Sequence, residues 1–190
     1  LGLHLEDRVA IASTTRYEWV LADLAIMCAG GATTTVYPTT MAEDVAYIIG
    51  DSGARIVFAE DDGQVEKLRT HRSEIPHVMK VVTFTGEAKN GDEEGDDWVI
   101  SLAELEALGR DALAARPTLV DERIDLVGPE HLAVIIYTSG TTGRPKGAEL
   151  TQDAIIYEGA AVDSIKLLTE DDLQFLWLPL SHIFGKILLT

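Results

Sequence analysis

The chain has 190 residues, of which 46% are hydrophobic and 25% charged, so it is long and apolar enough to bury the core of a domain. Its formal net charge of −17 repels polyanions and argues against nucleic acid as a partner. The longest apolar run, residues 20–28, is far shorter than the ~20 residues that span a bilayer, so no transmembrane segment is expected.

Cys28 is the single cysteine of the sequence. It cannot form an internal disulfide, and it lies in an apolar stretch with helical periodicity. Both observations predict a buried packing role in a reducing compartment. The sequence shows no signal peptide. We therefore expect a cytoplasmic protein, and peripheral contact with a membrane is left open.

Strand-like and helix-like patterns alternate from the N-terminus. Residues 8–13 predict a strand, and a helix follows it. The apolar face of this helix is predicted to consist of Tyr17, Val20, Leu21, Leu24, Met27 and Cys28. Thr15 and Glu18 have the spacing of a capping box at its start, and Gly30 with Gly31 predicts its end.

The same alternation continues through the next fifty residues. The predicted elements are strands at 32–38, 54–60 and 77–84 and helices at 40–53 and 65–70. Thr40 and Glu43 are predicted to cap the first of these helices. Such alternation is typical of an α/β fold with a largely parallel, doubly wound sheet flanked by helices.

The middle of the chain is interrupted by an acidic insertion, residues 87–97, which reads EAKNGDEEGDD. It has no apolar periodicity and predicts a mobile, solvated loop. A calcium site is the alternative, but the spacing of an EF-hand is missing. After it, Ser101 and Glu104 predict a capped helix that runs to about Ala115, and residues 117–129 predict a connector.

The stretch YTSGTTGRPKGAELT, from Tyr137 to Thr151, joins two predicted strands at 131–140 and 147–151, and a helix is predicted from Thr151. Its glycines let backbone N–H groups approach a ligand closely, and its hydroxyls and one ammonium can bind a polyphosphate. The glycines are Gly140, Gly143 and Gly147, the hydroxyls belong to Thr138, Ser139, Thr141 and Thr142, and the ammonium belongs to Lys146.

This loop is not a Walker P-loop, because Pro145 precedes Lys146 and Gly147 follows it, and because it joins strand to strand. On composition alone, a loop rich in Gly and Thr is more often a plain connection than a ligand site. Both interpretations therefore stay open at the level of residue types.

The motif YTSGTTGRPKG resembles the signature loop of the adenylate-forming superfamily, which includes acyl-CoA synthetases, adenylation domains and luciferases. The segments DRVAIAS, RYEWVLADLAI, YIIGDSGARIVFAE and LPLSHIFGK are similar to its long-chain fatty acid–CoA ligase branch. The resemblance covers most of the chain except the acidic insertion.

This resemblance implies a two-step reaction. A carboxylate attacks the α-phosphate of ATP to give an acyl-adenylate and pyrophosphate, and the thiol of coenzyme A then displaces AMP. The resemblance also implies that Thr138 helps to hold Mg²⁺ and acts with Lys146 as a catalytic residue. The residues that bind the β- and γ-phosphates would be Ser139, Gly140, Thr141, Thr142, Gly143 and Lys146.

His182 lies in the segment LPLSHIF. From the residues alone, a structural histidine near a buried strand end is the simpler interpretation. The resemblance implies instead that His182 lies beside the acyl and pantetheine paths, as a substrate-binding residue without a role in proton transfer.

The resemblance also implies that residues 1–190 are part of a large N-terminal AMP-binding domain, with the C-terminal catalytic domain absent. We therefore expect the isolated chain to be inactive and to self-associate as a homo-oligomer through exposed apolar segments. Two alternatives stay open: a fatty acyl-AMP ligase that delivers its product to a carrier protein, and a non-catalytic nucleotide-binding fragment.

Overall fold

The structure is a computed structural model, and it describes residues 1–86, 97–138, 143–166, 171–173 and 175–187. In chain order its elements are β1 (Arg8–Ala12), α1 (Tyr17–Cys28), β2 (Ala32–Val36), α2 (Ala42–Ser52), β3 (Ile56–Ala59), α3 (Asp62–Thr70), the 3-10 turn η1 (Arg72–Glu74), β4 (Lys80–Thr83), β5 (Val99–Ser101), α4 (Leu102–Ala115), α5 (Leu119–Ile124), β6 (Leu132–Thr138), β7 (Lys146–Thr151), α6 (Gln152–Ser164) and α7 (Ile183–Ile187).

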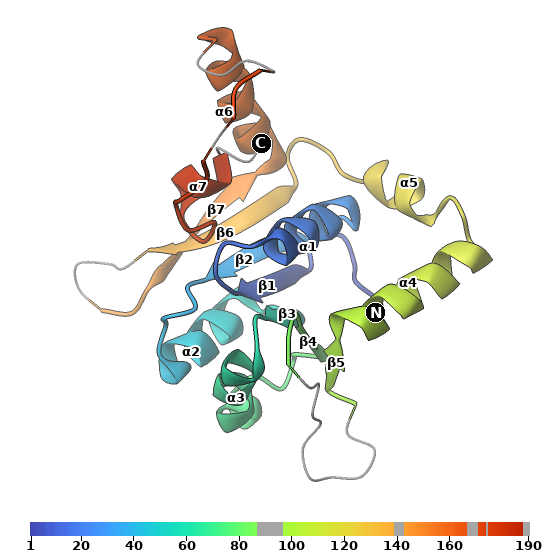
Figure 1. The fold of residues 1–190 in the computed structure, drawn as a ribbon, viewed down its shortest axis with the longest axis vertical. Helices are drawn as coiled ribbons and strands as arrows, with labels where there is room; N and C mark the ends of the chain where they lie inside the picture. The colour runs from blue at the N-terminus through green and yellow to red at the C-terminus, as the bar shows by residue number, and fades with distance from the viewer. Residues whose placement is uncertain (87–96, 139–142, 167–170, 174, 188–190) are drawn as a thin grey trace.

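The strands of the described residues form one sheet in the order β5-β4-β3-β1-β2-β6-β7 (Figure 1). Every neighbouring pair is parallel except β6 and β7, which are antiparallel. The chain starts in the middle of the sheet and builds outward on both sides of β1. This arrangement confirms the predicted α/β fold with a largely parallel, doubly wound sheet.

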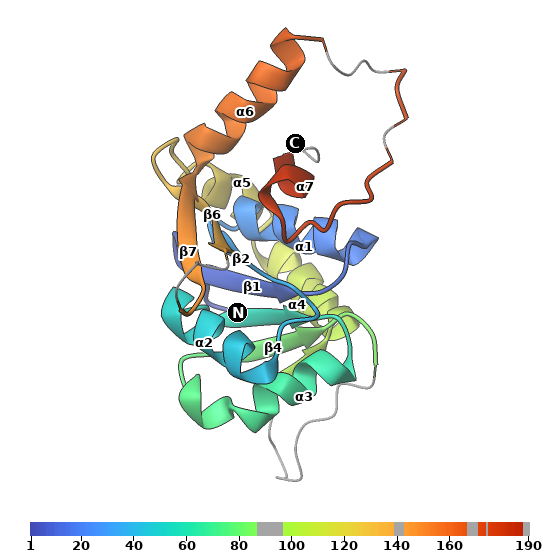
Figure 2. The ribbon, with the colours of Figure 1, turned by 90° about the vertical axis from the view of Figure 1, so that its left-hand side faces the viewer.

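The two faces of the sheet are covered by different helices, as the side chains of β1 show. Val9 and Ile11 pack into a core with α1, whereas Ala10 and Ala12, which point the other way, belong to a core with α2 and α3. Figure 2 shows α1 above the sheet and α2 and α3 below it. The sheet is therefore buried on both sides, as parallel sheets require.

The buried face of α1 differs from the predicted one. Its buried residues are Trp19, Ala22, Asp23 and Ile26. Of the predicted face, Tyr17, Leu21, Leu24 and Cys28 are exposed. The prediction of a buried Cys28 is therefore wrong. The helix is apolar around most of its circumference, so its sequence pattern does not select one face for burial. The face that is buried contains the charged residue Asp23, whose partner Lys186 lies 163 residues away in the sequence.

Two predicted helix caps are also wrong. Thr15 does not cap α1, whose N-cap residue is Arg16. The hydroxyl of Thr15 instead donates to the carbonyl of Leu178 and accepts from the N–H of Leu180, both at 3.1 Å. Thr40 does not cap α2, whose N-cap residue Met41 makes no side-chain cap bond. In the first case a hydrogen bond to a distant segment takes the place of a local one.

Other local predictions are confirmed. Ser101 and Glu104 form the predicted capping box of α4, and that helix ends at Ala115. Gly53 ends α2 in the left-handed conformation, with a φ of 64°, as a glycine C-cap does. The hydroxyl of Thr151 accepts a hydrogen bond from the N–H of Ala154 and caps α6.

Four short elements, η1, β5, α5 and α7, do not follow from the sequence pattern. β5 has three residues, which is too short for a periodic signal, and α5 lies inside the segment that was predicted as a connector. The guanidinium of Arg123 on α5 donates twice to the carbonyl of Ala29 at the end of α1, at 2.8 and 2.6 Å. This contact attaches α5 to the end of α1.

Residues 87–96 of the predicted acidic insertion lie outside the described residues. Asp97, the last residue of the insertion, is described and forms a 2.6 Å ion pair with Lys80. None of the helices in the described parts of the chain is both long and apolar enough to cross a membrane.

Candidate functional site

β6 and β7 form a hairpin whose ends flank the loop that is rich in Gly and Thr. Thr138 is the last residue of β6, Lys146 is the first of β7, and the two residues are paired across the ladder. This confirms the predicted strand–loop–strand arrangement. Gly143 has a φ of 127°, a conformation that favours glycine. The other predicted phosphate-binding residues, Ser139, Gly140, Thr141 and Thr142, lie outside the described residues.

The hairpin places Thr138, the residue before the undescribed part of the loop, at the carboxyl ends of the parallel strands. β1, β2, β3 and β6 run in the same direction, so their carboxyl ends lie along one edge. In open α/β sheets, ligands bind outside the carboxyl ends of the strands. Thr138 therefore lies where a ligand is expected to bind in this fold class.

A cavity of about 610 Å³ lies at this edge, between β2, α2, β6 and the segment before α7. Its polar lining residues include Thr35, Tyr37, Asp44, Thr138 and His182, and Pro145 of the loop lies beside them. A volume of this size is typical of pockets for small molecules. The structure thus brings two of the predicted site residues, Thr138 and His182, into one cavity, although they are far apart in the sequence.

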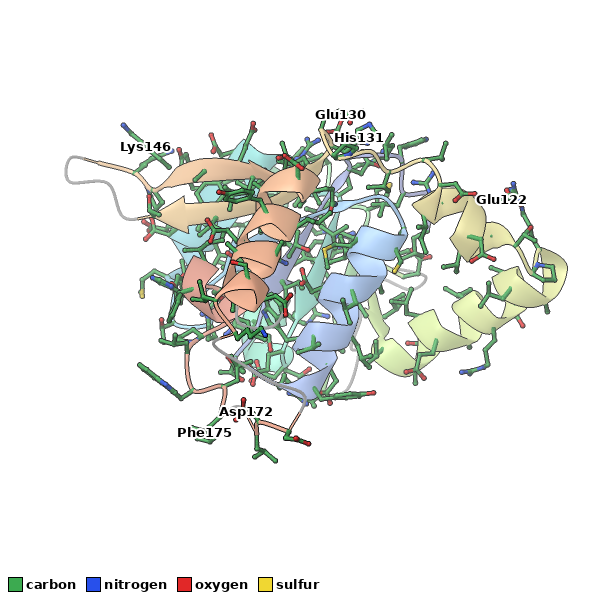
Figure 3. All side chains as sticks on the ribbon, turned by 90° about the horizontal axis from the view of Figure 1, so that it is seen from above. Glu122, Glu130, His131, Lys146, Asp172 and Phe175 are labelled. Carbon is green, nitrogen blue, oxygen red and sulfur yellow. The ribbon has the colours of Figure 1, made fainter. Side chains whose placement is uncertain are left out.

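Lys146 is not one of the residues that line the cavity. Its side chain is exposed, and Figure 3 shows it at the outer end of the hairpin, pointing away from the sheet. Gly143 is also exposed and lies outside the lining. Thr138 and His182 therefore line one cavity, whereas Lys146 and Gly143 do not.

Two contacts attach the ends of the loop to α2. The hydroxyl of Tyr137 donates to the carboxylate of Asp51 at 2.7 Å, and the guanidinium of Arg144 lies 4.8 Å from the ring centroid of Tyr47. Burial, and then the hydrogen bond to Asp51, raise the pKa of the Tyr137 phenol, so it stays a neutral donor. The spacing of Tyr47 and Asp51, four residues apart on one helix, is the sequence signal that could have identified this contact face.

Burial also raises the pKa of Tyr37, which follows β2 and lines the cavity. Neither Tyr37 nor Asp44 was singled out from the sequence. Tyr37 follows β2 and Asp44 lies in the first turn of α2, and the sequence pattern alone indicates no cavity at either position.

Polar contacts hold the segment that contains His182 against the carboxyl end of β2. The hydroxyl of Thr35 donates to the carbonyl of Ser181 at 3.1 Å, and the hydroxyl of Ser181 donates to the carbonyl of Val36 at 3.3 Å. Together with the two bonds of Thr15 to Leu178 and Leu180, they attach this segment to β2 and to the loop between β1 and α1. The position of His182 therefore depends on side chains that the sequence analysis assigned to other roles or to none.

The predicted metal ligand Thr138 contributes one exposed hydroxyl at the end of β6. The described residues contain no cluster of three or more His, Cys, Asp or Glu side chains that could hold a metal ion. Mg²⁺ usually takes few protein ligands and fills its coordination sphere with water and substrate phosphates. A single exposed hydroxyl oxygen beside the loop that is rich in Gly and Thr would fit a metal ion of this kind.

Comparison with protein families gives a match over the whole chain. The sequence pattern of the family described as AMP-binding enzyme matches residues 1–190. Among curated proteins, the long-chain-fatty-acid–CoA ligase FadD15 of Mycobacterium bovis is 33% identical over 188 residues, which are 98% of this chain and 29% of that protein. The human long-chain-fatty-acid–CoA ligase ACSBG1 is 31% identical over 191 residues, 98% of this chain and 25% of that protein.

Solved structures agree with the fold. A putative long-chain-fatty-acid CoA ligase from Rhodopseudomonas palustris superimposes with a TM-score of 0.69 at 25% identity, and the match covers 98% of this chain and 42% of that one. Apo MatB from the same organism gives a TM-score of 0.70 at 23% identity, over 99% of this chain and 33% of that one. The chain thus spans about a quarter to less than a third of the curated relatives named above, and less than half of these structures.

Proposed function

Because the chain belongs to the family of AMP-binding enzymes, which implies the use of ATP, we propose that it takes part in the ATP-dependent activation of a long-chain fatty acid. In this proposal the acid carboxylate attacks the α-phosphate of ATP to give an acyl-adenylate and pyrophosphate. The thiol of coenzyme A then displaces AMP to give the acyl-CoA thioester. The names of relatives that are 31–33% identical support the choice of acid.

One observation carries the proposal. Thr138, at the end of the signature hairpin, and His182, from a distant segment, line the same cavity at the carboxyl edge of the sheet. A reaction between a nucleotide and an acid requires both reactants to be held side by side, and such positioning can lower a barrier by about 7–11 kcal/mol. The cavity has one wall from the signature hairpin and another from the segment that contains His182.

We assign the phosphates to the hairpin side of the cavity. Thr138 and the loop would donate hydrogen bonds to phosphate oxygens, and Lys146 would provide the positive charge. The described ion pairs do not include Lys146, so its ammonium can bind a phosphate without first leaving a carboxylate. Because lysine has a long flexible stem, the ammonium can turn toward the cavity without a change in the backbone. Mg²⁺, held in part by Thr138, would neutralise phosphate charge when bound.

We assign the acid and the acceptor to the side of His182. Apolar side chains of Ile48, Ile136 and Ile183 line the cavity together with His182, and they suit an aliphatic chain near a polar group. His182 would bind and orient the substrate without transferring a proton. Its position in the lining of the cavity, which also includes Thr138, is the geometric support for this role.

ATP–pyrophosphate exchange with a long-chain fatty acid, on the protein at the full length encoded by its gene, tests the assignment of the phosphates. Lys146→Ala and Thr138→Val should slow exchange by about 10²–10³, because each removes a donor aimed at developing charge. Thr138→Ser, which keeps the hydroxyl, should stay within about tenfold of the wild type. Arg110→Ala, which removes an exposed cation of α4, is the matched control and should have no effect.

Pyrophosphate exchange at the wild-type rate in both Lys146→Ala and Thr138→Val would remove the phosphate assignment.

The acceptor is tested by comparing coenzyme A with acyl carrier protein at saturating acid and ATP. Faster transfer of the acyl group to the carrier protein would favour the alternative activity, a fatty acyl-AMP ligase, over a CoA ligase. No exchange by the wild-type protein with acids of any chain length would favour a non-catalytic nucleotide-binding protein.

A further inference from the structure

A buried ion pair joins α1 to α7. The Lys186 ammonium donates to both carboxylate oxygens of Asp23, at 2.5 and 2.6 Å, and the two side chains are only 1% and 2% exposed. The hydroxyl of Thr33 on β2 donates to the same carboxylate at 2.6 Å. The ammonium also lies 5.6 Å from the ring centroid of Trp19. Three elements, α1, β2 and α7, thus meet at one desolvated charge pair.

This pair is a poor device for stability alone. Removing two charges from water costs about as much as their attraction returns, and two apolar residues of similar volume often stabilise a core equally well. A buried pair does restrict the arrangement of the segments that contribute to it. If α7 moved by one residue, the Lys186 side chain would shift by ~1.5 Å and rotate by ~100°, and the charge would lose its partner.

The pair is also close to the cavity along the chain. His182 and Lys186 are four residues apart, and the N–H of Lys186 donates to the carbonyl of His182 at 3.1 Å. A residue four positions away on a helical turn follows any displacement of that turn. Figure 2 shows α7 beside α1, where the final segment of the chain returns to the sheet. The charge pair is therefore the buried end of the same turn whose other end lines the cavity.

We propose that Asp23 and Lys186 are positioning residues, which hold His182 in the cavity by fixing the register of residues 178–186 on the sheet. Thr33 assists them by orienting the carboxylate. The other contacts of this segment, from Thr15, Thr35 and Ser181, involve neutral groups. The charge pair is the contact that allows one register only.

The catalytic part of this inference rests on the proposed function, whereas its structural part does not. The main variant is the double substitution Asp23→Leu with Lys186→Met in the full-length protein, because it leaves no unpaired charge in the core. Lys80→Met, which removes the lysine of a surface ion pair with Asp97, is the matched control. Hydrogen exchange of peptides that cover residues 178–186 reports the register directly, and peptides from α2 serve as the internal reference.

In the double variant, the rate of amide hydrogen exchange in residues 178–186 should rise by at least about tenfold, while α2 keeps its protection from hydrogen exchange. Unchanged protection of residues 178–186 would overturn the proposal. If this variant does not fold, Thr33→Val, compared with Thr33→Ser, provides the same measurement with a smaller expected rise of about two- to tenfold.

The kinetic arm separates positioning from simple packing. The double variant should lose about 10–100-fold in kcat/KM for the acid, with the KM for ATP within about twofold of the wild type. Adding His182→Ala to it should cause no further loss, because both changes remove the same contact. Loss of protection with normal kinetics, or fully additive losses, would overturn the positioning role. If the wild-type protein forms no adenylate, the proposed function fails. The hydrogen-exchange measurement alone then still decides whether the ion pair fixes the register of residues 178–186.

Discussion

The two walls of the cavity are held by different kinds of interaction. The wall made by β6 and β7 is set mainly by the backbone, through a ladder of six residue pairs from Leu132↔Thr151 to Thr138↔Lys146. The wall made by residues 178–186 includes no strand, and side chains attach it to the loop after β1, to α1 and to β2. A backbone ladder tolerates many substitutions, whereas a segment held by a few side chains depends on each of them.

The largest loss of stability is expected from a substitution in the buried ion pair of Asp23 and Lys186. Lys186→Ala should lower the free energy of unfolding by about 3–5 kcal/mol, because it leaves the Asp23 carboxylate buried without its counter-charge. Lys80→Ala should cost less than about 1 kcal/mol, since its partner Asp97 is 86% exposed. Urea denaturation of both variants measures the two values. Equal losses would show that burial of the pair does not set its energetic weight.

Glycine substitutions sharpen the comparison by adding one methyl group to each wall. A Cβ at Gly185 would lie 2.5 Å from the carbonyl oxygen of Pro179, and a Cβ at Gly147 would lie 2.8 Å from a methyl group of Ile135. Both changes should destabilise by about 1–3 kcal/mol. Gly185→Ala should be the more costly one, because a backbone carbonyl that also accepts from the N–H of His182 cannot move aside as a side chain can.

Gly109→Ala on α4 is the matched control for these two glycines. A Cβ there meets nothing within 4 Å, so the change should stabilise the helix by about 0.5–1 kcal/mol. Thermal melting of the three variants gives the order directly. A larger loss for Gly147→Ala than for Gly185→Ala would mean that the hairpin is the less adaptable wall.

Among the contacts of the two walls, the smallest effect is expected at the hydrogen bond between the hairpin and α2. Tyr137→Phe removes the bond to Asp51 and should cost about 0.5–1.5 kcal/mol, since the ladder remains. It should also change the alkaline limb of stability. The pKa of Tyr137 is raised in the folded state, so above about pH 10 the unfolded chain loses the proton first and stability falls by about 1.4 kcal/mol per pH unit.

Below the unfolded pKa of tyrosine this contribution is fully present, and it is lost as the pH rises toward the folded value. Tyr137→Phe should therefore make the alkaline decline shallower. Tyr37, whose pKa is also raised by burial, contributes to the remaining slope, and Tyr37→Phe separates the two. An alkaline decline of the same steepness in Tyr137→Phe would contradict the assignment to this residue.

The sequence by itself determined the alternation of strands and helices, the strand–loop–strand arrangement around Thr138 and Lys146, and the capping box of Ser101 and Glu104. These features depend on hydrophobic periodicity and on contacts within a few residues of each other, which one sequence displays. The short strand β5 and the helix α5 were missed because three and six residues carry too little of that periodicity.

Only the tertiary structure decided which face of α1 is buried, what the hydroxyl of Thr15 binds, and that His182 lies in one cavity with Thr138. In each case the deciding partner is distant in the sequence: Lys186 for Asp23, Leu178 for Thr15, and β2 for the segment of His182. A pattern of residue types records how apolar a position is, but it does not record which remote group will satisfy a polar atom once water has been excluded.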